Sequence, residues 1–209
     1  MAEAMHRCRL YYQYPAQPSA MREAQLAHAI DDTDAACVLL CIDDRADDEN
    51  HLAALVDLVQ ERGLACLIHK DAALAERLGA DGVHIDADPT AYAQARKRLG
   101  ESASIGAGCG LSRHDAMLLA ELGADYVAFG TESGTIDAID ELAELIAWWS
   151  EIFVVPCLAW NVDSASDAAR LAALKADFLA PSIRIWREGD VLNRIGDIDS
   201  AIRRARRAA

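Results

Sequence analysis

The sequence is short of positive charge. Lysine and arginine together number 20 against 34 aspartates and glutamates, which gives a formal net charge of −14 at pH 7. A phosphate backbone is bound by a basic surface, so this balance argues against nucleic acid as a partner. No apolar run approaches the roughly 20 residues that span a bilayer, and residues 1–9 lack the apolar core of a signal peptide. We therefore expect a soluble, cytoplasmic protein with no membrane partner.

Paired cysteine and glycine motifs are missing as well. None of the six cysteines forms a Cys-x-x-Cys pair, and nearly all lie in apolar, strand-like runs such as residues 37–41. Reduced thiols in such runs behave as small hydrophobic side chains, so a disulfide framework is not expected. No Gly-x-Gly-x-x-Gly follows the first predicted strand, which argues against dinucleotide binding.

The sequence does contain a repeated helix–turn–strand phrase. It reads Leu-Gly-Ala-Asp-Gly-Val-His-Ile at residues 78–85 and returns as Leu-Gly-Ala-Asp-Tyr-Val at 122–127. A looser version, Leu-Lys-Ala-Asp-Phe-Leu, occupies residues 174–179. Gly79 suits the left-handed position just past the end of a helix. A recurring joint of this kind is typical of a chain of βα units.

Periodicity and turn residues predict eight strands that alternate with eight helices. The strands are predicted at residues 7–14, 36–42, 65–69, 82–85, 104–107, 126–129, 153–160 and 178–180. The helices are predicted at residues 20–30, 51–62, 72–78, 90–99, 113–122, 137–152, 164–174 and 195–207. This alternation fits a closed (β/α)₈ barrel or an open doubly wound sheet, and eight units favour the barrel. No linker divides the chain, so we expect one (β/α)₈ TIM-barrel domain over residues 1–209.

In such a barrel the site lies at the carboxyl ends of the strands. The side chains that follow the predicted strands are Tyr14, Asp43, Asp44, His69, Lys70, Asp71, Asp86, Asp88, Cys109, Gly130, Thr131, Trp160, Asn161, Ser182 and Arg184. Two glycine-containing segments, 106–110 and 133–135, also fall there. Their backbone N–H groups could cradle a phosphate, or their glycines could simply give room for a tight turn.

Three acids near the strand ends are candidate metal ligands. Asp71, Asp86 and Asp88 could hold Mg²⁺, which prefers carboxylates and water. In a chain this acidic they could equally be solvated loop residues.

A second metal candidate uses softer ligands. Two thiols, Cys41 and Cys109, lie near strand ends and could converge with His69 and His84. His84 could equally be a core histidine. The indole of Trp160 could stack on an aromatic ligand or could plug the barrel.

The phrases at residues 78–85 and 123–130, with Ser-Ile-Gly at 104–106 between them, resemble the thiamine phosphate synthase family, which includes the thiazole tautomerases. The resemblance is clear over about residues 65–135. It implies a (β/α)₈ barrel that is commonly dimeric, so a homodimer is a candidate assembly. It also implies a reaction in which a pyrimidine-methyl diphosphate joins a thiazole phosphate, with Mg²⁺, and diphosphate leaves.

The family's catalytic signatures are altered in this sequence. Where the family's second strand has Gln-x-Arg-x-Lys, this chain has Leu39, Cys41 and Asp43. Losing two cations and gaining an anion should repel a diphosphate. Lys70 stands where an ungapped match places a metal-binding Asp, and residues 160–161 replace a Gly-Gly pair with Trp-Asn.

Three hypotheses follow. The first is a weakly active or non-catalytic paralogue that binds a small thiazole- or pyrimidine-type phosphate and needs no cofactor. The second is an active, divergent synthase that uses Mg²⁺, and the third is a metal- or thiol-dependent function built on Cys41, Cys109 and His69. The candidate ligand-binding residues are His69, Lys70, His84, Gly108, Cys109, Gly130, Thr131, Ser133, Thr135, Trp160, Asn161 and Ser182.

Overall fold

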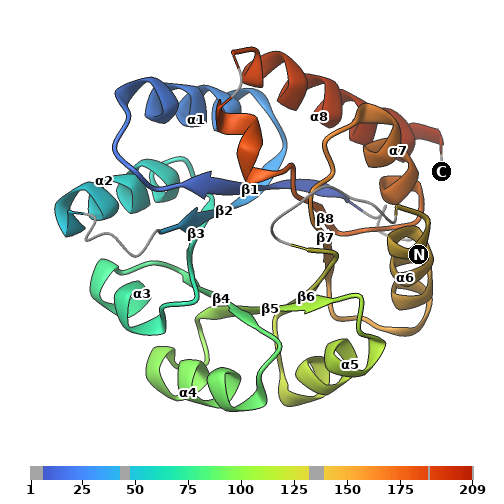
Figure 1. Cartoon of the computed structure of the whole chain (residues 1–209), viewed down its shortest axis with the longest axis horizontal. Helices are drawn as coiled ribbons and strands as arrows, with labels where there is room; N and C mark the ends of the chain where they lie inside the picture. Colours follow the sequence, from blue (N-terminus) through green and yellow to red (C-terminus); the bar gives the residue numbers. More distant parts are fainter. Residues whose placement is uncertain (1–6, 43–47, 132–138, 188, 209) are drawn as a thin grey trace, which may run out of the picture.

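Eight parallel strands close into a barrel, and a layer of helices surrounds it (Figure 1). The computed structural model describes residues 7–42, 48–131, 139–187 and 189–208. The strands are β1 (Arg9–Pro15), β2 (Ala35–Cys41), β3 (Ala65–His69), β4 (Gly82–Asp86), β5 (Ser104–Gly110), β6 (Tyr126–Phe129), β7 (Cys157–Ala159) and β8 (Phe178–Leu179). Each strand pairs with the next in sequence, and β8 pairs with β1. The closed barrel is therefore confirmed, and the open sheet is excluded.

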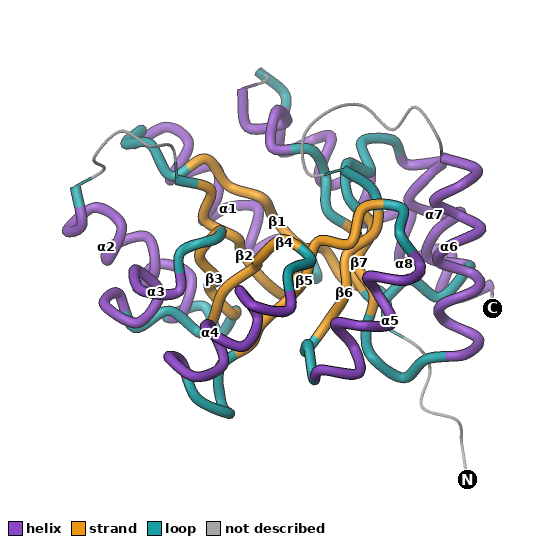
Figure 2. The backbone as a smooth tube through the Cα atoms, turned by 60° about the horizontal axis from the view of Figure 1, so that its bottom comes forward, coloured by secondary structure: helices purple, strands orange, loops and turns teal. Residues whose placement is uncertain are grey.

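The helices follow the strands in alternation, as Figure 2 shows from a second direction. They are α1 (Ala20–Asp32), α2 (Glu49–Gln60), α3 (Ala72–Leu78), α4 (Pro89–Leu99), α5 (Arg113–Leu122), α6 (Ile139–Ile152), α7 (Ala165–Ala173) and α8 (Val191–Ala208). A 3₁₀ helix, η1 (Ile183–Arg187), precedes α8 and was not predicted. Among the described residues, every helix is too short or too polar to cross a bilayer.

Two of the predicted segments were wrong. The strand predicted at 153–160 shortens to β7, because residues 153–156 fold back on the end of α6. There the ring of Phe153 stacks on Trp149 with centroids 4.0 Å apart, and Trp149 Nε1 donates to the carbonyl of Val155 at 2.7 Å. The glycine-rich segment 106–110, expected as a turn, continues β5 to its end.

The repeated phrase forms the joint between a helix and the next strand. Gly79 and Gly123 follow α3 and α5 with φ of 65° and 99°, in the left-handed region that glycine favours. The aspartates of the phrase have a further role, which the sequence did not reveal. The carboxylates of Asp81, Asp125 and Asp177 accept hydrogen bonds of 2.7, 2.7 and 2.8 Å from backbone N–H groups of the preceding strands. In each repeat, the aspartate side chain thus links the new strand to the preceding strand by a hydrogen bond.

Removing one of these carboxylates should destabilise the barrel. We expect Asp81→Ala to lower the free energy of unfolding by about 1.5–3 kcal/mol, since a buried N–H loses a charged acceptor. The matched control is Asp57→Ala on the exposed face of α2, which should change it by less than about 0.5 kcal/mol. Urea denaturation measures both changes. Equal losses in the two variants would contradict this role for the joint.

The barrel interior is filled by side chains rather than open. Its inner cluster contains Tyr11, Cys37, Leu39, Leu67, Tyr126, Ala128, Leu158, Trp160 and Ala180. The opposite faces of the strands pack against the helices in a larger cluster. Because both faces are buried, the strands read as continuous apolar runs. Gly106 leaves room for a large ring inside the barrel, since a Cβ there would lie 1.9 Å from Cζ of Tyr126.

Candidate functional site

The ends of β3 and β4 bring four of the expected residues together. The rings of His69 and His84 stack with centroids 6.4 Å apart and planes 16° from parallel. Lys70 Nζ lies 2.6 Å from Asp86 Oδ1. Lys70 holds a left-handed backbone conformation with φ of 60°, and its N–H donates to the carbonyl of His84 at 2.8 Å. This corner of the barrel mouth therefore combines two imidazoles with an ion pair.

A chain of buried polar groups runs from this corner into the barrel. His84 Nδ1 lies 2.8 Å from the hydroxyl of Tyr126, which lies 2.7 Å from the hydroxyl of Tyr11. Burial raises the pKa of Tyr11 well above its usual value, and the neighbouring Tyr126 raises it further. Both tyrosines were missed from the sequence because each sits inside a strand. The side chain of His84 has no exposed surface, as expected for a core histidine.

The two residues after β7 close the interior. Trp160 is fully buried, and its ring packs edge-on against Tyr11 and His84 with centroids 5.5 and 5.1 Å apart. Trp160 was considered either as a stacking surface for an aromatic ligand or as a plug of the barrel, and its burial favours the plug. Asn161 adopts φ of 58°, and its side-chain amide donates to the carbonyl of Thr131. Gly130 has a φ of 90°, and a Cβ added to it would lie 3.6 Å from Cβ of Trp160.

Three polar atoms at this end of the barrel are buried without a hydrogen-bond partner among the described residues: Trp160 Nε1, Gln13 Nε2 and Asn161 Oδ1. Gln13, 3% exposed, was missed from the sequence because it lies within β1. Burying such groups unpaired costs about 1–3 kcal/mol each. They mark a place where a polar ligand would recover hydrogen bonds.

The remaining candidates divide between the site and other roles. Gly108 lies in β5 opposite Asp86. Ser182 is 2% exposed, its N–H donates to Asp163, and its hydroxyl accepts from the N–H of Arg184. Ser133 and Thr135 lie outside the described residues.

The sequence matches a known family over most of its length. The match is to thiamine monophosphate synthase, and it covers residues 16–184. A thiamine-phosphate synthase from Rhodospirillum centenum is 41% identical over 187 residues, which is 86% of this chain and 89% of that protein. The chain belongs to the thiamine monophosphate synthase family.

A second relative supports this family assignment, and two solved structures share the barrel fold. A thiamine-phosphate synthase from Erythrobacter litoralis is 40% identical over 66% of this chain and 70% of its own. The structure of a thiamine phosphate pyrophosphorylase from Pyrococcus furiosus superposes with a TM-score of 0.75 at 16% identity, over 97% of this chain and 99% of that one. Tryptophan synthase from Mycobacterium tuberculosis gives the same TM-score at 12% identity, over 96% and 94%. At such identities the likeness shows the barrel fold alone.

The three carboxylates considered as candidate Mg²⁺ ligands have other partners. Asp71 caps α3 by accepting from the N–H of Leu74 at 2.8 Å, and Asp88 caps α4 by accepting from Thr90 at 2.7 Å. Asp86 pairs with a lysine, as described above. Within the described ranges no group of three or more His, Cys, Asp or Glu side chains could hold a metal ion. The residues present do not fit a metal site as arranged, so we derive no step through Mg²⁺.

The second candidate set, Cys41, Cys109, His69 and His84, does not form a metal-binding group in the described part of the chain either. Cys109 is 4% exposed, and burial raises its pKa to about 12. Burial likewise raises the pKa of Cys66 and of Cys157 to about 12. Only the thiolate is a good nucleophile, so these groups are inert at neutral pH.

Thiol reactivity should reflect this burial. We expect only Cys41, the one cysteine that is half-buried rather than buried, to react within minutes with an aromatic disulfide reagent in the native protein. All six should react in denaturant, and Cys41→Ser should remove the fast phase. Rapid native reaction of Cys109 would contradict the burial described here.

Proposed function

We propose that this protein binds a small pyrimidine- or thiazole-type phosphate at the strand ends and catalyses thiamine phosphate synthesis weakly or not at all. The observation that carries the proposal is the engagement of all three candidate carboxylates, two in helix caps and one in an ion pair. The inward-facing positions of β2 add to it, because they hold Leu39 and Cys41 and offer no cation to a diphosphate.

The mouth nonetheless offers contacts to a smaller ligand. Lys70 can exchange Asp86 for a phosphate, since an exposed ion pair is worth at most about 1 kcal/mol. The unpartnered N–H groups of Trp160 and Gln13 would donate to ring or carbonyl acceptors. The ring of His69, half-buried at the end of β3, supplies a stacking surface.

Calorimetric titration tests this binding. We would titrate the pyrimidine monophosphate, the thiazole phosphate and thiamine phosphate in EDTA, using wild type, Lys70→Gln and the control Lys97→Gln on the exposed face of α4. We expect one of the three ligands to bind, and Lys70→Gln to weaken it roughly tenfold or more while the control stays near wild type. Absence of binding to wild type, or equal losses in the two variants, would refute the proposal.

A second candidate is an active, divergent synthase. The 41% identity to a protein named thiamine-phosphate synthase favours it. Asparagine caps a helix about as well as aspartate but is a poor Mg²⁺ ligand. If the enzyme uses these acids for Mg²⁺, Asp71→Asn, Asp86→Asn or Asp88→Asn should abolish turnover without unfolding the protein. Unchanged turnover in all three would remove the metal assignment.

The proposal also covers assembly and partners. A homodimer and a cytoplasmic location remain expectations carried from the sequence, as does a small molecule rather than nucleic acid or membrane as the partner. Sedimentation equilibrium tests the dimer, and a monomer at micromolar concentration would reject it.

A further inference from the structure

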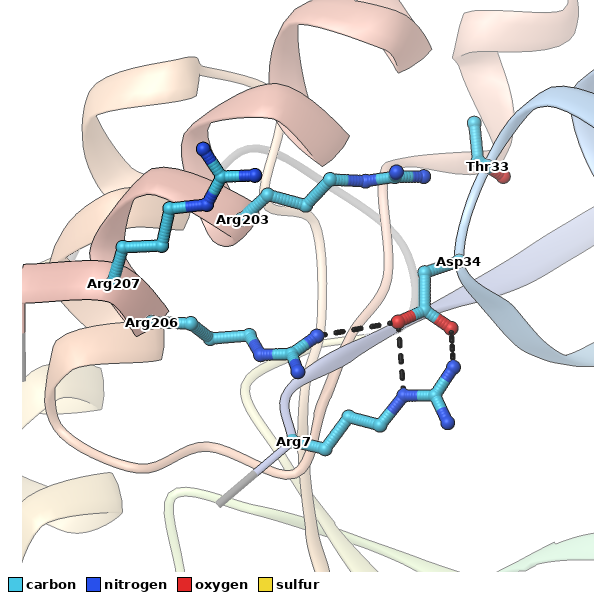
Figure 3. A pocket seen from close by; sticks show the side chains of 6 residues that line it. All are labelled: Arg7, Thr33, Asp34, Arg203, Arg206 and Arg207. Carbon is cyan, nitrogen blue, oxygen red and sulfur yellow. Dashed lines mark hydrogen bonds and ion pairs between the residues drawn. The ribbon is translucent and has the colours of Figure 1, made fainter. Parts of the chain in front are cut away.

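A basic cavity lies at the opposite end of the barrel from the candidate site. It has a volume of about 470 Å³ and is lined by Arg7, Thr33, Asp34, Arg203, Arg206 and Arg207 (Figure 3). Arg7 precedes β1 and Asp34 precedes β2, while the other arginines belong to the last turns of α8. The cavity therefore faces the amino ends of the strands, away from the mouth.

Guanidinium groups outnumber carboxylates around this cavity. Arg7 donates two hydrogen bonds to the carboxylate of Asp34, from Nη2 to Oδ1 at 2.6 Å and from Nε to Oδ2 at 3.0 Å. Arg9 and Arg206 also contact Asp34, at 3.2 and 3.4 Å. Desolvation raises the pKa of Asp34, but the hydrogen bonds and charges of Arg7 and Arg9 outweigh it, so the pKa is lowered and the carboxylate stays ionised.

One more carboxylate serves the same cluster. The buried Asp199 pairs with Arg203 at 2.6 Å and accepts from the N–H of Asp34 at 3.1 Å. Four guanidinium groups thus contact two carboxylates, and the guanidinium of Arg207 lines the cavity as a fifth, in a chain whose net charge is −14. In addition, Arg206 Nε is buried without a hydrogen-bond partner among the described residues. The local excess of positive charge and the buried N–H of Arg206, which lacks an acceptor among the described residues, both favour the binding of an anion.

We propose that this cavity binds a phosphate anion with two or more negative charges. Guanidinium groups bind phosphate oxygens in a bidentate manner, and here they approach one cavity from α8 and from the segment before β1. Asp34 and Asp199 hold three of the four arginines that line the cavity, so little ordering of side chains is needed on binding.

The neighbouring surface suggests room for an organic part of the ligand. A groove of about 450 Å³ between α1 and α8 shares Thr33 and Arg203 with the cavity. Gly196 also lines this groove, and a Cβ placed on it would meet no atom within 4 Å. A phosphate held by the arginines could therefore extend into this groove, or the anion could be inorganic. The shared chemistry is a phosphate group with two or more negative charges.

Calorimetry with inorganic diphosphate and with ADP, in EDTA and low salt, tests the proposal. We expect saturable binding to wild type, weakened roughly tenfold or more by the double variant Arg206→Gln/Arg207→Gln. If the double variant is unstable, Arg207→Gln alone takes its place, because this change leaves the pair between Arg206 and Asp34 intact. Arg207→Gln should also weaken binding. The matched control is Arg204→Gln, an equal loss of charge one residue away on α8 that does not line the cavity.

The outcomes separate this cavity from the mouth. Tighter binding of ADP than of diphosphate would identify an organic ligand, and equal affinity an inorganic one; both support the site. The proposal is overturned if wild type shows no saturable binding or if Arg204→Gln loses as much affinity as the arginine variants. It is also overturned if Lys70→Gln abolishes binding while the arginine variants keep it.

Discussion

Replacing Gly82 with alanine is expected to lower the free energy of unfolding by about 3 kcal/mol or more, or to prevent folding. A Cβ at Gly82 would lie 1.8 Å from the carbonyl oxygen of Ser104. That oxygen belongs to the backbone of β5, which pairs with β4 at this point. Neither strand can move without breaking its backbone hydrogen bonds to the strand on its other side. The clash of the added methyl group therefore cannot be relieved by a small shift.

The control for this substitution adds the same methyl where there is space. Gly196→Ala, inside α8, meets no heavy atom within 4 Å. It should raise the free energy of unfolding by about 0.5–1 kcal/mol, since alanine favours helix over glycine. Urea denaturation of both variants gives the comparison. A Gly82→Ala protein within about 1 kcal/mol of wild type would show that β4 and β5 are not this close.

Removing the indole of Trp160 should have a similarly large effect. The ring is fully buried and contacts Tyr11 and His84, so Trp160→Ala leaves a cavity inside the barrel. We expect a loss of about 3–5 kcal/mol in the free energy of unfolding. Ligand binding should weaken too, because the plug positions the rings of the mouth.

The comparison is with a tryptophan outside the barrel. Trp148→Ala removes the same side chain from α6, where Trp148 is partly exposed and packs under Arg113 at 4.7 Å from its ring. It should lose clearly less stability than Trp160→Ala. If thermal unfolding shows equal losses, the interior position of Trp160 is not what stabilises the barrel.

Much of the fold could be predicted because its joints are local. Gly79 marks a helix end by its conformation, and Ala72–Leu78 was predicted to the residue. The segment 106–110 was misread because glycine indicates a turn when only its neighbours are considered. Its first glycine is there to admit Tyr126, which lies 20 residues further along the chain.

The sites depend on contacts that sequence order hides. The chain from His84 through Tyr126 to Tyr11 joins three strands, and no spacing rule connects them. The mouth residues could be predicted as a set, since strand ends converge. Their pairing could not: only the structure shows Lys70 held by Asp86. The basic cavity likewise joins residues 172 positions apart, Asp34 and Arg206.

Under the proposed function, the barrel mouth keeps the family's fold and supports little synthase activity. The most direct measurement is thiamine phosphate formation from the pyrimidine-methyl diphosphate and the thiazole phosphate with Mg²⁺, at high protein concentration. The Rhodospirillum centenum relative, 41% identical and named a thiamine-phosphate synthase, serves as the comparison. We predict turnover at least about 10³-fold below that of the relative, because groups that stabilise a leaving diphosphate are worth that much. Rates within about tenfold of each other would contradict the claim and show that other residues hold the diphosphate.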